Sequence, residues 1–75
     1  MLMKVGKPNE VESQVILEFS RKRKELGYSY GKMAELTGLH RTTISLVERQ
    51  KIHPTLLVSL KMADALKLKL SDLVP

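Results

Sequence analysis

The chain has 75 residues, enough for one domain, and a domain of this size buries only roughly 60% of its unfolded surface, so self-association is expected to add stability. It contains no cysteine and only two histidines, a composition that excludes disulfides and thiolate metal sites and argues against any structural metal. Lys and Arg outnumber Asp and Glu by 13 to 8, which favours a polyanionic partner, although charge alone would serve solubility equally well.

Residues 1–9 are expected to form a flexible tail, and residues 10–75 a single domain. The segment 1–8 contains Lys, Gly and Pro and shows no hydrophobic periodicity, so we expect it to be mobile. No apolar run reaches the roughly 20 residues of a membrane span, and the N-terminus lacks the apolar core of a signal peptide. A cytoplasmic location is therefore expected.

A first helix is predicted from Glu10 to Leu26. Asn9 and Glu12 have the spacing of a capping box at its start, and Gly27 ends it. The apolar residues that recur at helical spacing and predict its buried face are Val11, Val15, Ile16, Phe19 and Leu26.

One charged residue of this helix differs from its neighbours. The run from Arg21 to Glu25 is typical of a solvated face, but Arg23 lies four residues after Phe19 and therefore points toward the core. A buried guanidinium needs an anion, and Glu48 is the best candidate in the sequence. We therefore predict a buried ion pair between Arg23 and Glu48.

The stretch from Ser29 to Glu48 has the pattern of a helix-turn-helix. A short helix is predicted from about Tyr30 until Gly38, which can take the left-handed conformation that ends a helix. A second helix is predicted from about Arg41, and the small side chain of Ala34 lets it cross close over the first. The apolar residues expected at the corner and on the buried sides are Leu39, Met33, Ile44 and Val47.

The second short helix has a mainly polar outer face. Its members are Arg41, Thr42, Ser45, Leu46 and Arg49. An exposed helix that presents Arg, Thr and Ser from its first turns has the size and the donors that suit the DNA major groove.

The first short helix is weak by local rules. Ser29 is a good cap, but interior Gly31 costs about 0.5 to 1 kcal/mol, and Lys32 places a cation at the positive end of the helix dipole. Both features make sense if this end faces a DNA phosphate, with Gly31 letting the backbone approach and Tyr30 offering a hydroxyl. The alternative is a helix held only by tertiary contacts.

A loop with three cationic or potentially cationic side chains follows Glu48 and ends at Pro54. Thr55 can cap a further helix from Leu56 to Leu66, and Leu57 lies off its apolar stripe. The inward-facing residues predicted for this helix are Leu56, Leu60, Ala63 and Leu66. A last apolar turn is expected from Leu70, Leu73 and Val74.

From about Val15 to Leu73 the chain resembles the lambda-repressor-like, Xre-type family of helix-turn-helix proteins. The residues that carry the resemblance are Arg23, Leu26, Gly27, Ser29, Met33, Ala34, Glu35, Gly38, Leu39, Arg41, Thr42, Thr43, Ile44, Ser45, Val47, Glu48, Arg49, Pro54, Thr55, Leu60, Met62, Ala63 and Leu66.

Membership of this family implies an all-α domain of five helices, with the third as the recognition helix, and DNA binding as a twofold dimer. It also implies that Arg23 and Glu48 form the buried ion pair of the family. Within the family, the segment 38–42 with Ile44 and Ser45 looks like the small controller proteins of restriction-modification operons.

Several positions depart from the family pattern. His40 replaces the usual Ser, Thr or Asp cap of the recognition helix, and a neutral imidazole caps less well. Gln50 and Lys67 each replace a glycine, Ser59 replaces an apolar residue, and Lys32 replaces a carboxylate. These departures bear on the loop and on the last helix rather than on the fold.

The expected function is sequence-specific binding of double-stranded DNA to regulate transcription. By the family's positions, the residues expected to reach base edges are Arg41, Thr42 and Leu46, with assistance from Ser45. The residues expected at phosphates are Tyr30, Lys32, Thr43, Lys51 and His53, each of which has a merely solvated role as its alternative.

A homodimer is expected because the chain has more apolar residues near its C-terminal end than the predicted core can bury. The predicted interface consists of Leu57, Leu68, Leu70, Leu73 and Val74. A twofold contact would place two recognition helices roughly 34 Å apart on a palindromic site. The alternative is that Leu70 and Leu73 close the core of the monomer.

A protein-interaction module, such as an antitoxin or a transcriptional bridging factor, is the second function class, and Leu57 and Val58 would then serve as its contact. The short chain favours the DNA reader. No enzyme is expected, because the sequence has no paired carboxylates, no histidine-based triad and no Gly-rich phosphate loop. Nothing in the sequence calls for a cofactor or a small-molecule ligand.

Overall fold

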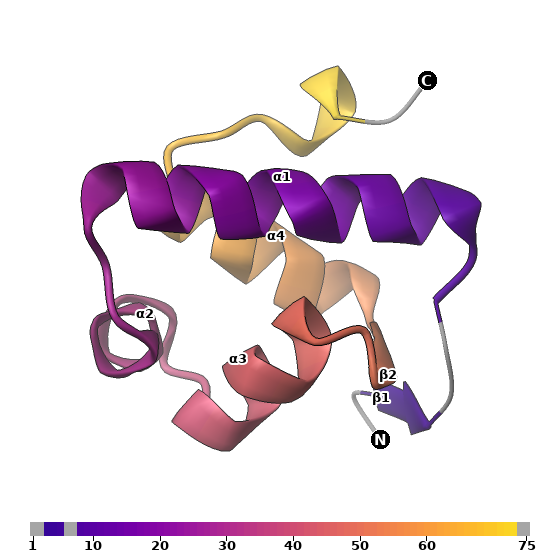
Figure 1. Ribbon diagram of the computed structural model, residues 1–75, viewed down its shortest axis with the longest axis horizontal. Coiled ribbons are helices and arrows are strands. Elements are labelled where there is room, and N and C mark those ends of the chain that lie inside the picture. The colour runs from indigo at the N-terminus through magenta and orange to yellow at the C-terminus, as the bar shows by residue number, and fades with distance from the viewer. Residues whose placement is uncertain (1–2, 6–7, 74–75) are drawn as a thin grey trace.

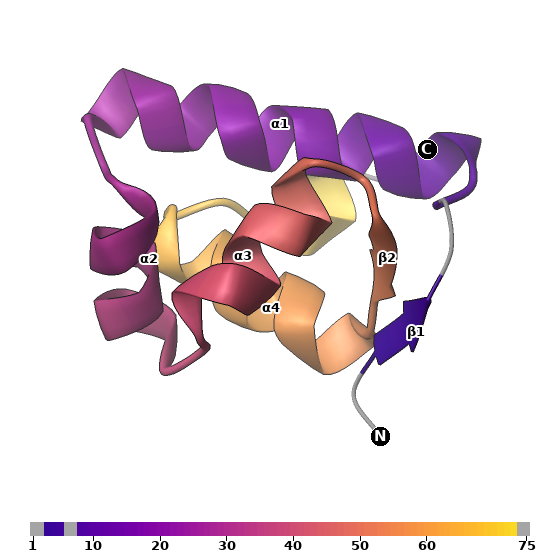
Figure 2. The same cartoon turned by 60° about the horizontal axis from the view of Figure 1, so that its bottom comes forward.

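Within residues 3–5 and 8–73, which a computed structural model describes, the chain forms four α-helices, a two-stranded sheet and one 3-10 turn (Figure 1). The elements are, in chain order, β1 (Met3–Val5), α1 (Glu10–Leu26), α2 (Tyr30–Thr37), α3 (Arg41–Glu48), β2 (Ile52–Pro54), α4 (Leu56–Ala65) and the 3-10 turn η1 (Leu70–Asp72). Figures 1 and 2 show α1 running the length of the molecule, with α2 beside its C-terminal end and α3 packed beneath it.

Local signals set the ends of the first two helices as predicted. Asn9 and Glu12 form a capping box in which each side chain accepts a hydrogen bond of 2.8 Å from the backbone N–H of the other residue. The Ser29 hydroxyl caps α2 by accepting from the Lys32 N–H at 3.0 Å. Gly27 and Gly38 take the left-handed conformation, with φ of 73° and 76°, so both predicted helix stops are confirmed.

Two residues without the freedom of glycine share this conformation. Gln50 has a φ of 57° and Lys67 a φ of 59°. These are the two positions at which the sequence has a side chain in place of a family glycine. The backbone therefore keeps the glycine geometry at both positions, at a cost of about 1 to 2 kcal/mol each.

The core is formed where α1, α2, α3 and α4 meet. Eight side chains have less than 2% of their surface exposed, namely Phe19, Ile16, Met33, Ile44, Met62, Leu66, Val47 and Val58. Leu39 packs against this cluster at the helix-turn-helix corner, as predicted, and Ala34 packs against it from α2. The buried sides predicted for α2 and α3 are thus confirmed.

The buried faces of α1 and α4 differ in part from the prediction. On α1, Val11 and Leu26 are 41% and 38% exposed, since they lie near the two ends of a helix that outreaches its neighbours. On α4, the predicted inward residues Leu56 and Leu60 are 69% and 47% exposed. The residues that α4 buries are Val58, Ser59, Met62 and Ala63. Ala63, and Leu66 directly after the helix, are buried as predicted.

The reason for the difference on α4 is composition. Apolar residues lie on several sides of this helix, so their periodicity is compatible with more than one buried face. The packing of α4 against α2 and β2 selects the face of Val58. Val58 is therefore unavailable to a partner, contrary to the second functional hypothesis.

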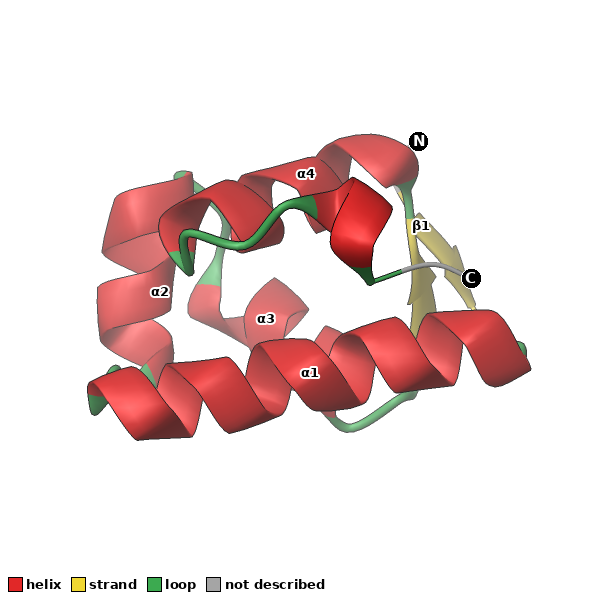
Figure 3. Ribbon diagram, turned by 90° about the horizontal axis from the view of Figure 1, so that it is seen from above, coloured by secondary structure: helices red, strands yellow, loops and turns green. Residues whose placement is uncertain are grey.

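The expected fifth helix is replaced by η1, a single 3-10 turn, so the described residues contain four α-helices. The left-handed Lys67 ends α4, and the extended backbone of Lys69 separates it from η1. Because the first turn of an α-helix is costly to nucleate, a single 3-10 turn forms here in its place. Figure 3 shows η1 lying over α4, and Leu68, Leu70 and Leu73 pack against the core.

The sheet was not predicted. Strand β1 pairs with β2 in antiparallel register, with Met3 opposite Pro54, Lys4 opposite His53 and Val5 opposite Ile52. Each strand has only three residues, too few for a periodic sequence signal. The division into a flexible tail and a domain stays a prediction, with three residues of the tail segment paired to the domain.

Candidate nucleic-acid interface

Helix α3 is anchored on one side and open on the other. Ile44 and Val47 have no exposed surface, whereas Arg41 and Thr42, in its first turn, are exposed. Arg49, which follows the helix, is also exposed. Thr43, Ser45 and Leu46 are half-buried, so the free surface of α3 lies mainly at its N-terminal end.

A threonine fixes the corner between α2 and α3. The Thr37 hydroxyl donates to the Met33 carbonyl oxygen at 2.7 Å and accepts from the Leu39 N–H at 3.1 Å. It thereby links the last turn of α2 to the first residue after Gly38. This contact was not predicted, because its only local signal is a threonine directly before the glycine that ends the helix.

The structure brings the predicted pair Arg23 and Glu48 together. Arg23 Nε donates to Glu48 Oε2 at 2.7 Å and to Oε1 at 3.0 Å, and the two side chains are 12% and 2% exposed. The Ser20 hydroxyl donates to Oε1 at 3.0 Å. The hydrogen bonds to the Glu48 carboxylate raise the pKa of Arg23 above its ordinary value, so the guanidinium stays charged, and the pair joins α1 to the end of α3.

Arg23 also contacts the residues on either side of the Ser29 cap of α2. Its Nη1 donates to the carbonyl oxygen of Tyr28 at 2.8 Å, and its guanidinium lies 4.6 Å from the centre of the Tyr30 ring. Tyr30 is half-buried and packs against the core. One side chain thus positions both short helices of the motif.

The residues predicted to meet phosphates lie in unlike surroundings. Lys32 and Lys51 are exposed, and Thr43 is half-buried. His53 is half-buried too, and its Nδ1 lies 2.9 Å from Glu12 Oε1. His53 therefore contacts the N-terminal turn of α1, an interaction between residues 41 positions apart that sequence spacing does not indicate.

The loop after α3 is held by a second contact with α1. The Ser13 hydroxyl donates to Gln50 Oε1 at 2.7 Å. Together with the Glu12 contact of His53, it ties the segment between α3 and β2 to the first half of α1. These two contacts were not predicted, because nothing in the sequence around each residue distinguishes it from an ordinary polar surface residue.

The Arg41 side chain folds back toward α2. A β-carbon added to Gly31 would lie 3.2 Å from Arg41 Nη2 and 3.8 Å from Cζ, so the guanidinium lies directly against the open side of Gly31. Gly31 was predicted to let the DNA backbone approach. In the structure the side chain of Arg41, from α3, lies against it.

His40, at the N-cap of α3, makes no side-chain capping hydrogen bond. The imidazole cap considered in the sequence analysis is therefore absent. The helix begins without the stabilisation that Ser, Thr, Asp or Asn would supply at this position.

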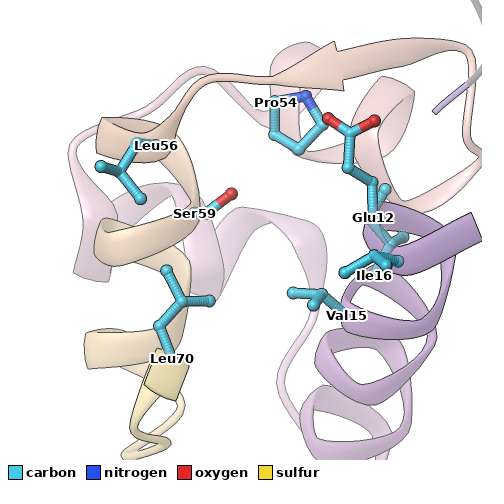
Figure 4. Close-up of a pocket in the computed structure, with 8 residues that line it drawn as sticks. Glu12, Val15, Ile16, Pro54, Leu56, Ser59 and Leu70 are labelled. Atoms are coloured by element: carbon cyan, nitrogen blue, oxygen red, sulfur yellow. The ribbon is translucent and has the colours of Figure 1, made fainter. Parts of the chain in front are cut away.

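An apolar groove of about 250 Å³ lies between α1, α4, β2 and η1 (Figure 4). Its lining residues are Val11, Glu12, Val15, Ile16, Pro54, Leu56, Ser59 and Leu70. Beside it, Leu57 and Leu60 of α4 are 48% and 47% exposed. Of the predicted dimer residues, Leu68, Leu70 and Leu73 are half-buried, and Val74 lies outside the described residues.

Among residues 3–5 and 8–73, no group of three or more His, Asp or Glu side chains is placed to bind a metal ion. Over the same residues, no helix combines the length and the apolar character needed to cross a membrane.

Sequence comparisons agree with this geometry. A family model described as helix-turn-helix matches residues 20–73. The chain is also 36% identical over 50 residues to YgzD of Bacillus subtilis strain 168, an uncharacterised HTH-type transcriptional regulator, and the match covers 67% of this chain and 76% of that protein.

Solved structures share the fold. C.AhdI, a restriction-modification controller protein from Aeromonas hydrophila, matches with 32% identity and a TM-score of 0.68, over 84% of this chain and 91% of that one. NHTF, a hypothetical transcription factor from Neisseria, matches with 28% identity and a TM-score of 0.77, over 96% and 90%. The controller C.Esp1396I, crystallised as a tetramer in complex with its natural 35 base-pair operator, has a TM-score of 0.78 at 23% identity, over 88% and 87%, and bears on the fold alone.

Proposed function

Because the chain belongs to the Xre-type helix-turn-helix family of transcriptional regulators, we propose that it binds a specific sequence of double-stranded DNA through the major groove. Family membership confirms the assignment made from the sequence, and members of this family are not enzymes. The observation that carries the proposal is the division of α3 into a buried face, Ile44 and Val47, and an exposed first turn, Arg41 and Thr42.

The proposed base readers are Arg41, Thr42, Ser45 and Leu46. Arg41 has the donors for a bidentate contact to guanine, and Leu46 has the apolar surface for a thymine methyl group. Since Ser45 and Leu46 are half-buried, we assign the larger part of the readout to the two exposed residues.

The proposed phosphate contacts are Tyr30, Lys32, Thr43 and Lys51. Lys32 and Lys51 are exposed cations at the ends of the motif, and they add attraction that does not depend on base sequence. We give His53 a reduced role, because its Nδ1 is engaged with Glu12.

We propose a homodimer formed through the exposed apolar surface of α4, defined here as Leu56, Leu57 and Leu60. This surface adjoins the apolar groove, in which Leu56 is a lining residue. It replaces Leu68, Leu70 and Leu73 as the centre of the interface, because those side chains pack against the core of their own chain. A twofold dimer suits a palindromic operator whose half-sites lie roughly 34 Å apart.

We further propose that the protein acts in the cytoplasm, where its DNA target is found, and that it is a controller-like member of the family, similar to the controllers of restriction-modification operons. C.AhdI, at 32% identity, supports the second statement.

Selection from a library of randomised DNA duplexes tests the function. The wild-type protein should enrich one palindromic sequence, and Arg41→Ala should weaken binding to it by about 1 to 3 kcal/mol while leaving binding to random duplexes nearly unchanged. Lys51→Ala should weaken both kinds of binding and flatten the salt dependence by about one unit of slope. Failure to enrich any sequence would favour the protein-interaction module instead.

A further inference from the structure

We propose that Gly31 is a positioning residue for DNA readout: the space left by its missing side chain holds the Arg41 guanidinium and so sets the direction from which Arg41 meets a base. The inference rests on the proposed function, in which Arg41 is a base reader. It concerns two residues on different helices, Gly31 in the first turn of α2 and Arg41 at the start of α3.

The geometry is one of close contact. A β-carbon on Gly31 would lie 3.2 Å from Arg41 Nη2, 3.8 Å from Arg41 Cζ and 3.6 Å from Ser29 Oγ. The first of these distances is shorter than ordinary van der Waals contact. An alanine at position 31 would therefore require the guanidinium to give by a few tenths of an ångström, and a longer side chain would compete with it for the same space.

The backbone of Arg41 has little freedom to compensate. Ile44 and Val47 hold α3 in the core with no exposed surface, and the hydroxyl of Thr37 fixes the turn that precedes the helix. The position of the Arg41 backbone relative to α2 is therefore set by packing. What remains variable is the direction of its long side chain, which Gly31 governs.

The contact restrains Arg41 without using its donors. Among the hydrogen bonds and ion pairs of the described residues, none involves the Arg41 guanidinium. The start of α2 is electropositive, through the helix dipole and Lys32, so this helix end does not attract the guanidinium. An arginine whose range of directions is narrowed by contact, while its donors stay free, loses less conformational entropy when it binds a base.

Gly31 costs local stability, which makes the inference testable. Glycine inside a helix is less stable than alanine or leucine, so filling position 31 should keep or raise the melting temperature. Its effect on readout should have the opposite sign. A purely structural role for Gly31 would move both quantities in the same direction.

The experiment uses the full chain and two probes, the duplex enriched by the wild-type protein and a duplex of random sequence. Gly31→Leu should lower affinity for the enriched duplex by roughly five- to 100-fold, the range expected for loss of an arginine–base contact, with a smaller loss for Gly31→Ala. Affinity for the random duplex should stay within about twofold, and both variants should melt no lower than wild type.

The matched control repeats both substitutions in the Arg41→Ala protein. There they should lower affinity for the enriched duplex by less than about twofold relative to Arg41→Ala alone, because the guanidinium that they displace is absent. Undiminished specific affinity of Gly31→Leu, or an equal loss in the Arg41→Ala background, would overturn the inference. A wild-type protein that enriches no sequence would overturn the proposed function and this inference with it. That result is recognisable because it does not involve position 31.

Discussion

Two regions of this domain are held together by different chemistry. Where α1 meets α3 and the loop after it, polar side chains make directional contacts: Arg23 with Glu48, and Ser13 with Gln50. Around α4 and η1 the contacts are mainly apolar, and three leucines of α4 remain at the surface.

The difference bears on the proposed function, in which one small chain both reads DNA and forms a dimer. Hydrogen bonds and ion pairs have preferred distances and angles, so the contacts of α1 hold α3 in one orientation. Apolar contact has no preferred direction and grows with area, so the α4 surface can extend the core into a second copy. The polar region suits the recognition helix, and the apolar region suits the dimer.

The largest expected effect lies in the polar region. Arg23→Ala and Glu48→Ala should each lower the free energy of unfolding by about 3 to 5 kcal/mol, because each leaves a buried charge without its partner. Such a loss approaches the total stability of a small domain, about 5 to 15 kcal/mol. Urea denaturation followed by circular dichroism measures it.

The control for this prediction is an ion pair at the surface. Arg21 contacts Glu18 and Glu25, but its side chain is 60% exposed, so Arg21→Ala should leave the melting temperature nearly unchanged. If Arg23→Ala melted as close to wild type as Arg21→Ala does, the polar region would not be what orients α3.

In the apolar region, Leu57→Glu should turn the dimer into a monomer with little change in the stability of the fold, because Leu57 is already 48% exposed. Loss of the second recognition helix should weaken operator binding by about tenfold or more. Sedimentation at micromolar concentration reports the mass. Leu17→Glu is the matched control, since Leu17 is 59% exposed on α1, outside the proposed interface. If both variants were monomeric, or if neither were, the α4 surface would not be the dimer interface.

A smaller effect is expected at the start of α3, where the N-cap residue His40 makes no capping hydrogen bond. His40→Asp should raise the free energy of unfolding by about 1 kcal/mol, because a carboxylate can cap the helix as His40 does not. His40→Ala serves as the reference, since it removes the imidazole without adding an acceptor. Equal thermal stability of the two variants would mean that the cap position adds nothing.

The smallest expected effect concerns the two left-handed residues, Lys67 in the apolar region and Gln50 in the polar region. Lys67→Gly should stabilise the protein by about 0.5 to 1 kcal/mol, because Lys67 holds a left-handed backbone at φ 59°. Gln50→Gly should gain less, since it relieves the same strain but loses the hydrogen bond from Ser13. Equal gains would show that the Ser13 contact does not contribute to the stability of the polar region.

What could be predicted from the sequence was local or rested on a charge that required a partner. The helix ends at Gly27 and Gly38 and the cap at Ser29 depend on residues within one turn of the chain, so their pattern is visible without a structure. The pairing of Arg23 with Glu48 could be inferred because a buried guanidinium has few anions to choose from.

Tertiary structure alone decided the features that join distant residues or select between similar faces. Val58 rather than Leu60 is buried on α4, and β1 pairs with β2 across some 50 residues, because packing against the rest of the chain chooses among options that are locally equivalent. The same holds for Gly31 and Arg41. Each residue was assigned a separate role from the sequence, and only the crossing of α2 and α3 puts the guanidinium of one into the space left by the other.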